Sequence, residues 1–302
     1  MRRQGRFSLG VLVAAMLGAC ATGGHSSTLE RGRIAIHGHR GSRGTAPENT
    51  LPAFEEALRA GADVLEMDLG VTRDGVLVVY HDQEVNPVIC RAPRGRTHAL
   101  PLQRLTLREL KRYDCGSLKN PRFPNQVAVP GTRVPTLGEF FRWVKGSSLP
   151  GAATVKFNIE MKSEEARPEL APPPAEFARL LVGELRRQGM LERTIIQSFD
   201  FRTLREARRL ASEAVLSALV EDRPKQSLVE LARSAGGAQV VSPNHEWLTR
   251  EDVAAAHAAG IQVAPWTANT PAEWDRLTGF GVDAIITDYP RAAIEWRRAS
   301  VP

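Results

Sequence analysis

The chain has 302 residues, a formal net charge of +6 and hydrophobic residues at 42% of its positions, which suits one large α/β barrel or, as the alternative, two domains. Three arginines lie within the first six residues, so removing them halves the excess charge, and the remaining charges are mixed without a long basic run. This distribution gives no case for a nucleic-acid platform, while the mild positive charge is of the sign that helps to recruit anionic substrates.

The N-terminus has the layout of a signal peptide, predicted to cover residues 1–19, because an apolar run too short for a permanent membrane span follows the arginines. The sequence Leu17-Gly18-Ala19-Cys20 resembles a bacterial lipoprotein signal. That resemblance implies cleavage before Cys20 and lipidation of this residue, giving an exported, membrane-anchored lipoprotein that faces the periplasm or cell exterior. An ordinary secretory signal is the alternative. Residues 20–30 are predicted to be a flexible leash, followed by the globular domain from residue 31.

Short β-branched runs then alternate with amphipathic segments. The predicted strands are 33–37, 63–69, 154–160, 194–197, 215–219, 239–242, 262–265 and 284–287. The predicted helices are 51–60, 137–144, 176–188, 201–211, 226–234, 250–259, 271–278 and 291–298. This alternation indicates parallel pairing, and eight strands with eight helices predict a closed (β/α)₈ barrel of the TIM type. A doubly wound open sheet is the alternative.

The first predicted strand is followed directly by His39 and Arg40. Histidine can both take and give a proton near neutral pH, which makes His39 a candidate for acid–base chemistry. His37 lies two residues before His39, and whether it has a role of its own is left open. In the following segment either Asn49 or Thr50 is expected to cap a helix, and Glu48 is either a capping-region charge or a partner of Arg40.

Two carboxylates, Glu66 and Asp68, stand two residues apart on the second predicted strand, so both project from one face. Strand ends in a barrel point into the active-site mouth. Neighbouring buried carboxylates repel each other unless a cation or a proton compensates them. The alternative is a pair at a strand end that faces solvent.

A third strongly β segment, 76–80, follows the second strand too closely for a crossover helix. Since Asp-Gly is a type I′ hairpin signal, Asp74-Gly75 predicts that this segment is the return arm of a hairpin. With these two residues as the whole loop, counting outward places His81 opposite Asp68.

The barrel rhythm breaks over residues 83–135, which predicts an inserted cap over the barrel mouth with one short helix near 105–110. Cys90 and Cys115 both lie in this insertion. In an exported protein such a pair is a disulfide candidate; two free buried thiols are the alternative.

Glu160 ends a later strand, and Lys162 shares its face. Together with Glu66 and Asp68, Glu160 completes a set of oxygen ligands that suits one divalent cation, Ca²⁺ or Mg²⁺, rather than Zn²⁺.

These residues resemble the glycerophosphodiester phosphodiesterase family across essentially the whole mature domain. The matching motifs include His39-Arg40-Gly41, Pro47-Glu48-Asn49-Thr50, Glu66-x-Asp68, Thr72-Arg73-Asp74-Gly75, His81-Asp82, Ile159-Glu160-Met161-Lys162, Ser198-Phe199-Asp200, Trp266-Thr267-Ala268-Asn269 and Thr287-Asp288-Tyr289-Pro290. The resemblance implies a TIM-type barrel with an inserted subdomain. It further implies that the divalent cation is held by the carboxylates of Glu66, Asp68 and Glu160, and that His39 and His81 form the acid–base pair. The phosphate would be gripped by Arg40 and Lys162, and the alcohol-side pocket would be lined by Trp266.

The implied reaction cleaves deacylated phospholipids, such as glycerophosphocholine, to sn-glycerol 3-phosphate and an alcohol. Direct water attack and a cyclic-phosphate route both fit, as does either assignment of acid and base. An enzyme of the phospholipase D or phosphatidylinositol-cleaving type, acting on lyso or intact lipids, is the alternative activity. A non-catalytic envelope lipoprotein is a weaker one. The sequence gives no prediction of the oligomeric state.

Overall fold

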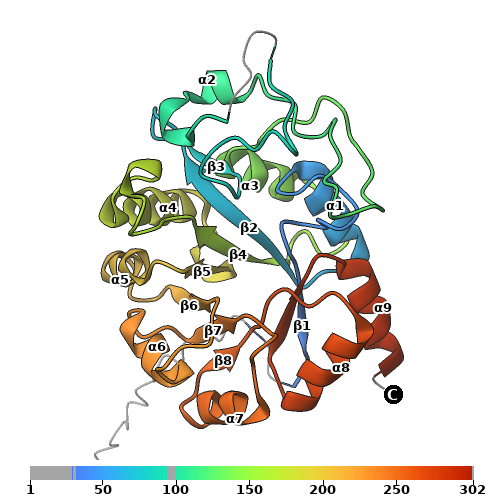
Figure 1. Cartoon of the computed structure of the whole chain (residues 1–302), viewed down its shortest axis with the longest axis vertical. Helices are drawn as coiled ribbons and strands as arrows, with labels where there is room; N and C mark the ends of the chain where they lie inside the picture. The colour runs from blue at the N-terminus through green and yellow to red at the C-terminus, as the bar shows by residue number, and fades with distance from the viewer. Residues whose placement is uncertain (1–28, 30–31, 94–98, 301–302) are drawn as a thin grey trace, which may run out of the picture.

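The structure, a computed structural model, describes residue 29 and residues 32–93 and 99–300 (Figure 1). The predicted signal peptide, the lipidation site Cys20 and all of the predicted leash except Leu29 lie outside the described residues. No helix within the described ranges is long and apolar enough to cross a membrane.

Eight parallel strands form the core of the molecule. They are β1 (Ala35–Gly38), β2 (Val64–Val71), β4 (Lys156–Met161), β5 (Thr194–Ser198), β6 (Val215–Val220), β7 (Val240–Pro243), β8 (Gln262–Val263) and β9 (Ala284–Thr287). Their order is β8-β7-β6-β5-β4-β2-β1-β9. The two ends of this sheet meet, because Asp283 N donates to Val263 O at 2.9 Å and Ile286 N donates to Pro265 O at 3.0 Å. The predicted barrel is therefore confirmed, and the open doubly wound sheet is excluded.

Helices surround this barrel (Figure 1). They are α1 (Leu51–Ala60), α3 (Leu137–Gly146), α4 (Pro174–Gln188), α5 (Phe201–Leu210), α6 (Leu228–Ser234), α7 (Arg250–Ala258), α8 (Pro271–Phe280) and α9 (Pro290–Ser300). Local chemistry sets their ends. In α1, for example, the hydroxyl of Thr50 accepts from Ala53 N, and Gly61 ends the helix at φ +89°. The main hydrophobic core lies between the helices and the strands.

The N-terminal opening of the barrel is filled by an apolar layer that includes Leu29, Ala35, Val64 and Ile195. Leu29 is 2% exposed, so this residue, predicted as part of the leash, belongs instead to the folded domain. The physical reason is burial of its side chain against the strand starts. This apolar layer closes the N-terminal end of the barrel, so a functional site is expected at the C-terminal end of the strands.

A hairpin joins β2 to β3 (Leu77–Val79), and the two strands are antiparallel as predicted. The predicted register is wrong by one residue: Leu69 pairs with Val79, so Asp68 stands opposite Tyr80 rather than His81. The loop contains three residues, since Thr72 N donates to Val76 O at 3.1 Å and Gly75 adopts φ +74°. The strand ends at Val79 and the chain then bends.

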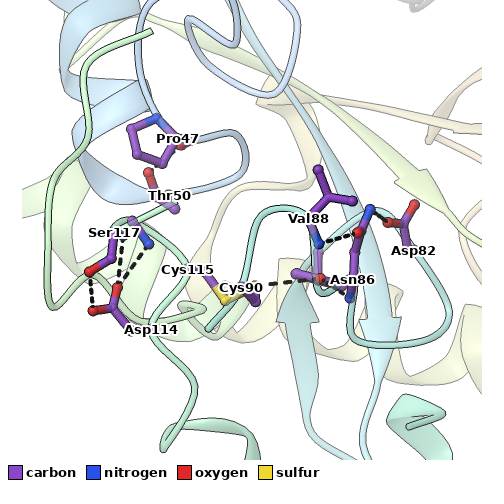
Figure 2. Close-up of a disulfide and its surroundings, with 11 residues drawn as sticks. Pro47, Thr50, Asp82, Asn86, Val88, Cys90, Asp114, Cys115 and Ser117 are labelled. Atoms are coloured by element: carbon purple, nitrogen blue, oxygen red, sulfur yellow. Dashed lines mark hydrogen bonds between the residues drawn. A yellow bond between two sulfur atoms is a disulfide. The ribbon is translucent and has the colours of Figure 1, made fainter. Parts of the chain in front are cut away.

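The inserted segment after the hairpin has a separate small apolar core that includes Tyr80, Leu102 and Tyr113. It contains the short helix α2 (Leu107–Leu110), near the predicted position. Cys90 and Cys115 form a disulfide in this core, with an S–S distance of 2.02 Å (Figure 2).

The insertion is also fastened to the loop after β1. Gln126 Nε2 donates to the carbonyls of Arg43 and Ala46, both at 2.9 Å. The insertion and the β1–α1 loop therefore lie together beside the barrel mouth.

Candidate active site

Three buried carboxylates meet at the carboxyl ends of two neighbouring strands. Glu66 and Asp68 come from β2 and Glu160 from β4, and Asp68 and Glu160 are register partners. One oxygen atom from each lies within 4.8 Å of the others. Sequence spacing placed Glu66 and Asp68 on one face, and strand pairing adds Glu160.

The charges of this triad are only partly balanced by protein groups. Burial raises the pKa of Glu160 to about 7 against the opposing charge of Lys162, and the charge of Asp68 raises it further. The pKa of Glu66 is raised in the same way, by burial and by Asp68. Burial would also raise the pKa of Asp68, but Arg40, His81 and Lys162 hold it well below its usual range. A buried set of oxygens with this excess negative charge fits a hard divalent cation.

Neighbouring backbone and side-chain donors hold each carboxylate of β2 in place. Glu66 accepts from Arg40 N at 2.8 Å and from Gln197 Nε2 at 2.9 Å. Asp68 Oδ2 accepts from Asn49 Nδ2 at 2.8 Å. Asn49 adopts φ +56°, a left-handed conformation that Asn tolerates better than most residues. The helix cap predicted at Asn49 or Thr50 is therefore Thr50, and Asn49 belongs to the site.

The loop after β1 turns tightly to deliver these groups. Gly41 has φ +83°, and a Cβ on it would lie 2.5 Å from the backbone of Ala53. Only glycine fits such a position. The turn brings the backbone amide of Arg40 onto Glu66 while His39 stays beside the barrel mouth.

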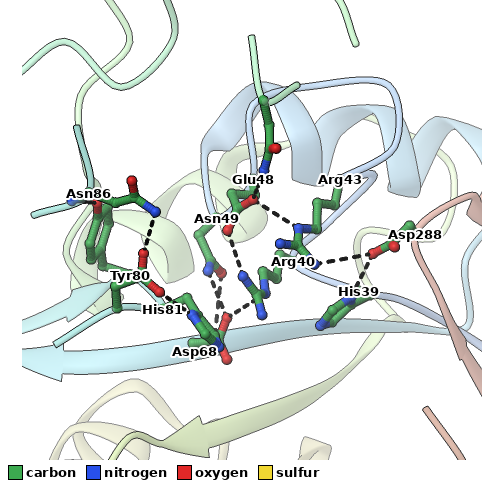
Figure 3. Close-up of polar contacts among 12 residues, drawn as sticks. His39, Arg40, Arg43, Glu48, Asn49, Asp68, Tyr80, His81, Asn86 and Asp288 are labelled. Carbon is green, nitrogen blue, oxygen red and sulfur yellow. Dashed lines mark hydrogen bonds and ion pairs between the residues drawn. The ribbon is translucent and has the colours of Figure 1, made fainter. Parts of the chain in front are cut away.

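Each candidate histidine is paired with an aspartate through Nδ1. His39 Nδ1 lies 2.6 Å from Asp288 Oδ1 (Figure 3), and His81 Nδ1 lies 2.5 Å from Asp82 Oδ1. Burial lowers the pKa of both imidazoles, although Asp288 opposes this effect at His39 and Asp68 opposes it at His81. Because the aspartates occupy Nδ1, the Nε2 atom of each ring is the one left for chemistry.

Two cations accompany the acids. Arg40 lies between Glu48, at 2.6 Å, and Asp68, at 3.1 Å (Figure 3), so Glu48 is a partner of Arg40 and not a capping charge. Lys162 Nζ lies 2.9 Å from Glu160 Oε1 and 3.2 Å from His81 Nε2. Lys162 therefore contacts both Glu160 of the triad and the imidazole of His81.

One cavity of about 870 Å³ joins these groups. Its lining includes His39, Arg40, Glu66, His81, Glu160, Lys162 and Trp266. Trp266 packs edge-on against Phe199, with ring centres 5.5 Å apart, and its Nε1 donates to Ser242 O at 2.8 Å. The cavity thus has a charged wall and an aromatic wall, an arrangement suited to a phosphate ester.

Residues 39–292 match the model of the glycerophosphoryl diester phosphodiesterase family. The chain belongs to this family. A glycerophosphodiester phosphodiesterase of Caldanaerobacter subterraneus subsp. tengcongensis is 32% identical over 264 residues, covering 87% of this chain and 97% of that protein. One from Bacillus subtilis is 28% identical over 294 residues, covering 94% and 92%. The predicted family and enzyme class are confirmed.

Solved structures support the same placement of this phosphodiesterase. A candidate glycerophosphoryl diester phosphodiesterase from Silicibacter pomeroyi DSS-3 superposes with a TM-score of 0.82 at 33% identity, covering 89% of this chain and 95% of that chain. An Oleispira antarctica phosphodiesterase, solved with the product sn-glycerol-3-phosphate, has a TM-score of 0.73 at 24% identity and covers 91% and 99%. At that identity the second likeness shows the fold alone.

Four further residues of the phosphodiesterase site were assigned no role from the sequence. They are Asp82, Asp288 and Gln197, together with Asn269, which donates to Asp288 Oδ2 at 2.9 Å. Asp82, Asp288 and Asn269 stand in the motifs that match the family, and Gln197 lies at the end of a predicted strand. Their partners depend on strand order, which spacing alone does not give.

His37 lies inside the barrel and provides a pH-dependent contribution to stability. Burial lowers its pKa to about 4, against the opposing charge of Asp63. The unfolded chain takes up this proton near pH 6.5 and the folded chain does not, so the free energy of unfolding falls as the pH drops from about 6.5 to 4, by about 3 kcal/mol at most. We expect His37→Gln to lose this part of the pH dependence in urea unfolding at pH 7 and pH 4.5. An unchanged slope in the variant would show that His37 is protonated in the folded state.

Proposed function

We propose that this phosphodiesterase uses one divalent cation, Ca²⁺ or Mg²⁺, to hydrolyse glycerophosphodiesters to sn-glycerol 3-phosphate and an alcohol. The observation that carries the proposal is the shared cavity, in which two aspartate-bound histidines flank a buried carboxylate triad. Glu66, Asp68 and Glu160 would hold the cation, which supplies charge stabilisation at the phosphate oxygens when bound.

The protein groups around the triad have complementary roles in this proposal. Arg40 and Lys162 grip the phosphate from the charged wall, and Trp266 lines the pocket for the alcohol. His39 and His81 move the protons: one takes a proton from the attacking group, and the other gives one to the leaving alcohol. Asp288 and Asp82 fix the two rings so that Nε2 meets the substrate. These roles serve direct water attack and a cyclic-phosphate route equally.

A substrate panel tests the proposal. Glycerophosphocholine, glycerophosphoethanolamine and glycerophosphoglycerol are each incubated with the enzyme, and sn-glycerol 3-phosphate is measured by a coupled dehydrogenase assay. We expect release from at least one of these diesters, and slower turnover of lyso-phosphatidylcholine and intact lipids. Faster cleavage of the lipids would instead support the alternative of a phospholipase D or phosphatidylinositol-cleaving activity.

We further propose that the protein is exported and anchored to a membrane through a lipid on Cys20. Two features support this: the N-terminal sequence resembles a lipoprotein signal, and the Cys90–Cys115 disulfide suits an oxidising compartment. The mass of the mature N-terminal peptide tests the proposal, since cleavage at any other position contradicts it.

A further inference from the structure

The carboxylate triad stands on a polar layer inside the barrel, and one member of this layer, Gln197, also lines the cavity. Gln197 of β5 is 1% exposed and donates from Nε2 to Glu66 Oε1 at 2.9 Å. The second oxygen of Glu66 accepts from Arg40 N at 2.8 Å. Both oxygens of this carboxylate are therefore bound by protein donors.

Gln197 is itself held from below. Its Oε1 accepts from Asn158 Nδ2 at 2.9 Å, and the same nitrogen of Asn158 lies 3.5 Å from His37 Nδ1. All three side chains are buried. Because the oxygen of the Gln197 amide accepts from Asn158, its nitrogen must face Glu66.

We propose that Gln197, held by Asn158 and His37, is a positioning residue that fixes the carboxylate of Glu66 for the cation. This inference rests on the proposed function, since it assigns a partner to one of the proposed ligands. Within the described residues the side chain of Gln197 hydrogen-bonds to Glu66 and to Asn158, so we expect its effect on cation binding to pass through the carboxylate.

The physical argument is geometric. Donors on both oxygens restrict rotation of the Glu66 carboxyl group, so less freedom is lost when the cation binds. Partners of this kind on metal ligands typically change affinity about 10–100-fold when they are removed.

The same layer offers a matched control. Ser217 of β6 is the register partner of Gln197 and is fully buried, but its hydroxyl pairs with that of Ser242 at 2.8 Å. No hydrogen bond joins Ser217 to the triad among the described residues. If the polar layer had a purely structural role, substitutions at Ser217 and at Gln197 would weaken cation binding equally.

The test measures binding of Ca²⁺ alone and Mg²⁺ alone by calorimetry, in chelator-treated protein without substrate. We expect Gln197→Met to raise the Kd by about 10–100-fold, Asn158→Leu to raise it less, and Ser217→Ala to leave it within about twofold. Thermal unfolding of each variant verifies folding, and Gln197→Asn, which keeps the amide but shortens its reach, replaces Gln197→Met if that variant does not fold.

The outcomes separate the two proposals. A parent enzyme that binds neither cation overturns the cation-dependent function and this inference with it. A parent that binds while Gln197→Met and Gln197→Asn bind within about twofold of it overturns the positioning role alone. Weakened binding in Ser217→Ala equal to that in Gln197→Met also overturns it, since the whole layer would then act through stability.

Discussion

Replacing His39 by alanine is expected to lower kcat by about 10²–10⁴-fold, and replacing His81 to lower it over the same range, because each ring performs one of the two proton transfers. Both rings lie in the cavity with Nδ1 bound to an aspartate, so each substitution removes one Nε2 atom from the cavity. The measurement is kcat at saturating substrate and cation, with near-ultraviolet circular dichroism to show that each variant is folded.

His257 provides the matched control for these variants. It pairs with Asp283 at 2.8 Å at the start of β9, on the end of the barrel opposite the cavity, so His257→Ala should leave kcat within about twofold. The kcat of the double variant lacking His39 and His81 should be only slightly lower than that of the less active single variant, because the effects of removing groups that act together are not additive. Retention of more than half of kcat by either single variant would remove that histidine from proton transfer.

Periodicity of the sequence predicted the barrel because it depends on local patterning. Every predicted strand of the barrel is present, with ends shifted by a few residues; the predicted strand 262–265, for example, is reduced to Gln262–Val263. The hairpin register failed for a more specific reason. The Thr72 hydroxyl accepts from Val76 N at 3.1 Å and donates to Asp74 at 2.6 Å, which extends the loop to three residues. Such side-chain contacts decide turn type and are not visible in an Asp-Gly pair.

For the site as well, residues placed by local sequence pattern were predictable, whereas residues placed by tertiary contacts were not. Glu66 and Asp68 were predicted because alternation along one strand is local, and Glu160 because it ends another strand. Asn49 looked like a helix cap, since Asn has that preference, but the left-handed turn after β1 directs its side chain to Asp68. Asp288 reaches His39 only because β9 pairs with β1, a contact across 249 positions that closure of the barrel creates.

Removing the cation by chelation is expected to abolish activity, by about 10³-fold or more, because the carboxylates and two protein cations alone leave the developing charge on the phosphate poorly compensated. Either Ca²⁺ or Mg²⁺ should restore activity to the chelated enzyme. Glu160→Gln should require far more cation for the same rate, while Glu246→Gln, an exposed position outside the triad, should behave as the parent. The rates are measured across a titration of each ion.

The same cation should stabilise the fold in a pH-dependent manner. A ligand that binds only the folded state adds about 2.7 kcal/mol at 100 times its Kd, so Tm should rise on its addition at pH 8. Since burial raises the pKa of Glu160 to about 7, a proton occupies this carboxylate below that pH and must be displaced before the cation binds. The rise in Tm should therefore shrink as the pH falls from 8 to 5. A rise of equal size at both pH values would show that protonation of the triad does not compete with the cation, and activity that survives exhaustive chelation would show that the triad serves the reaction without one.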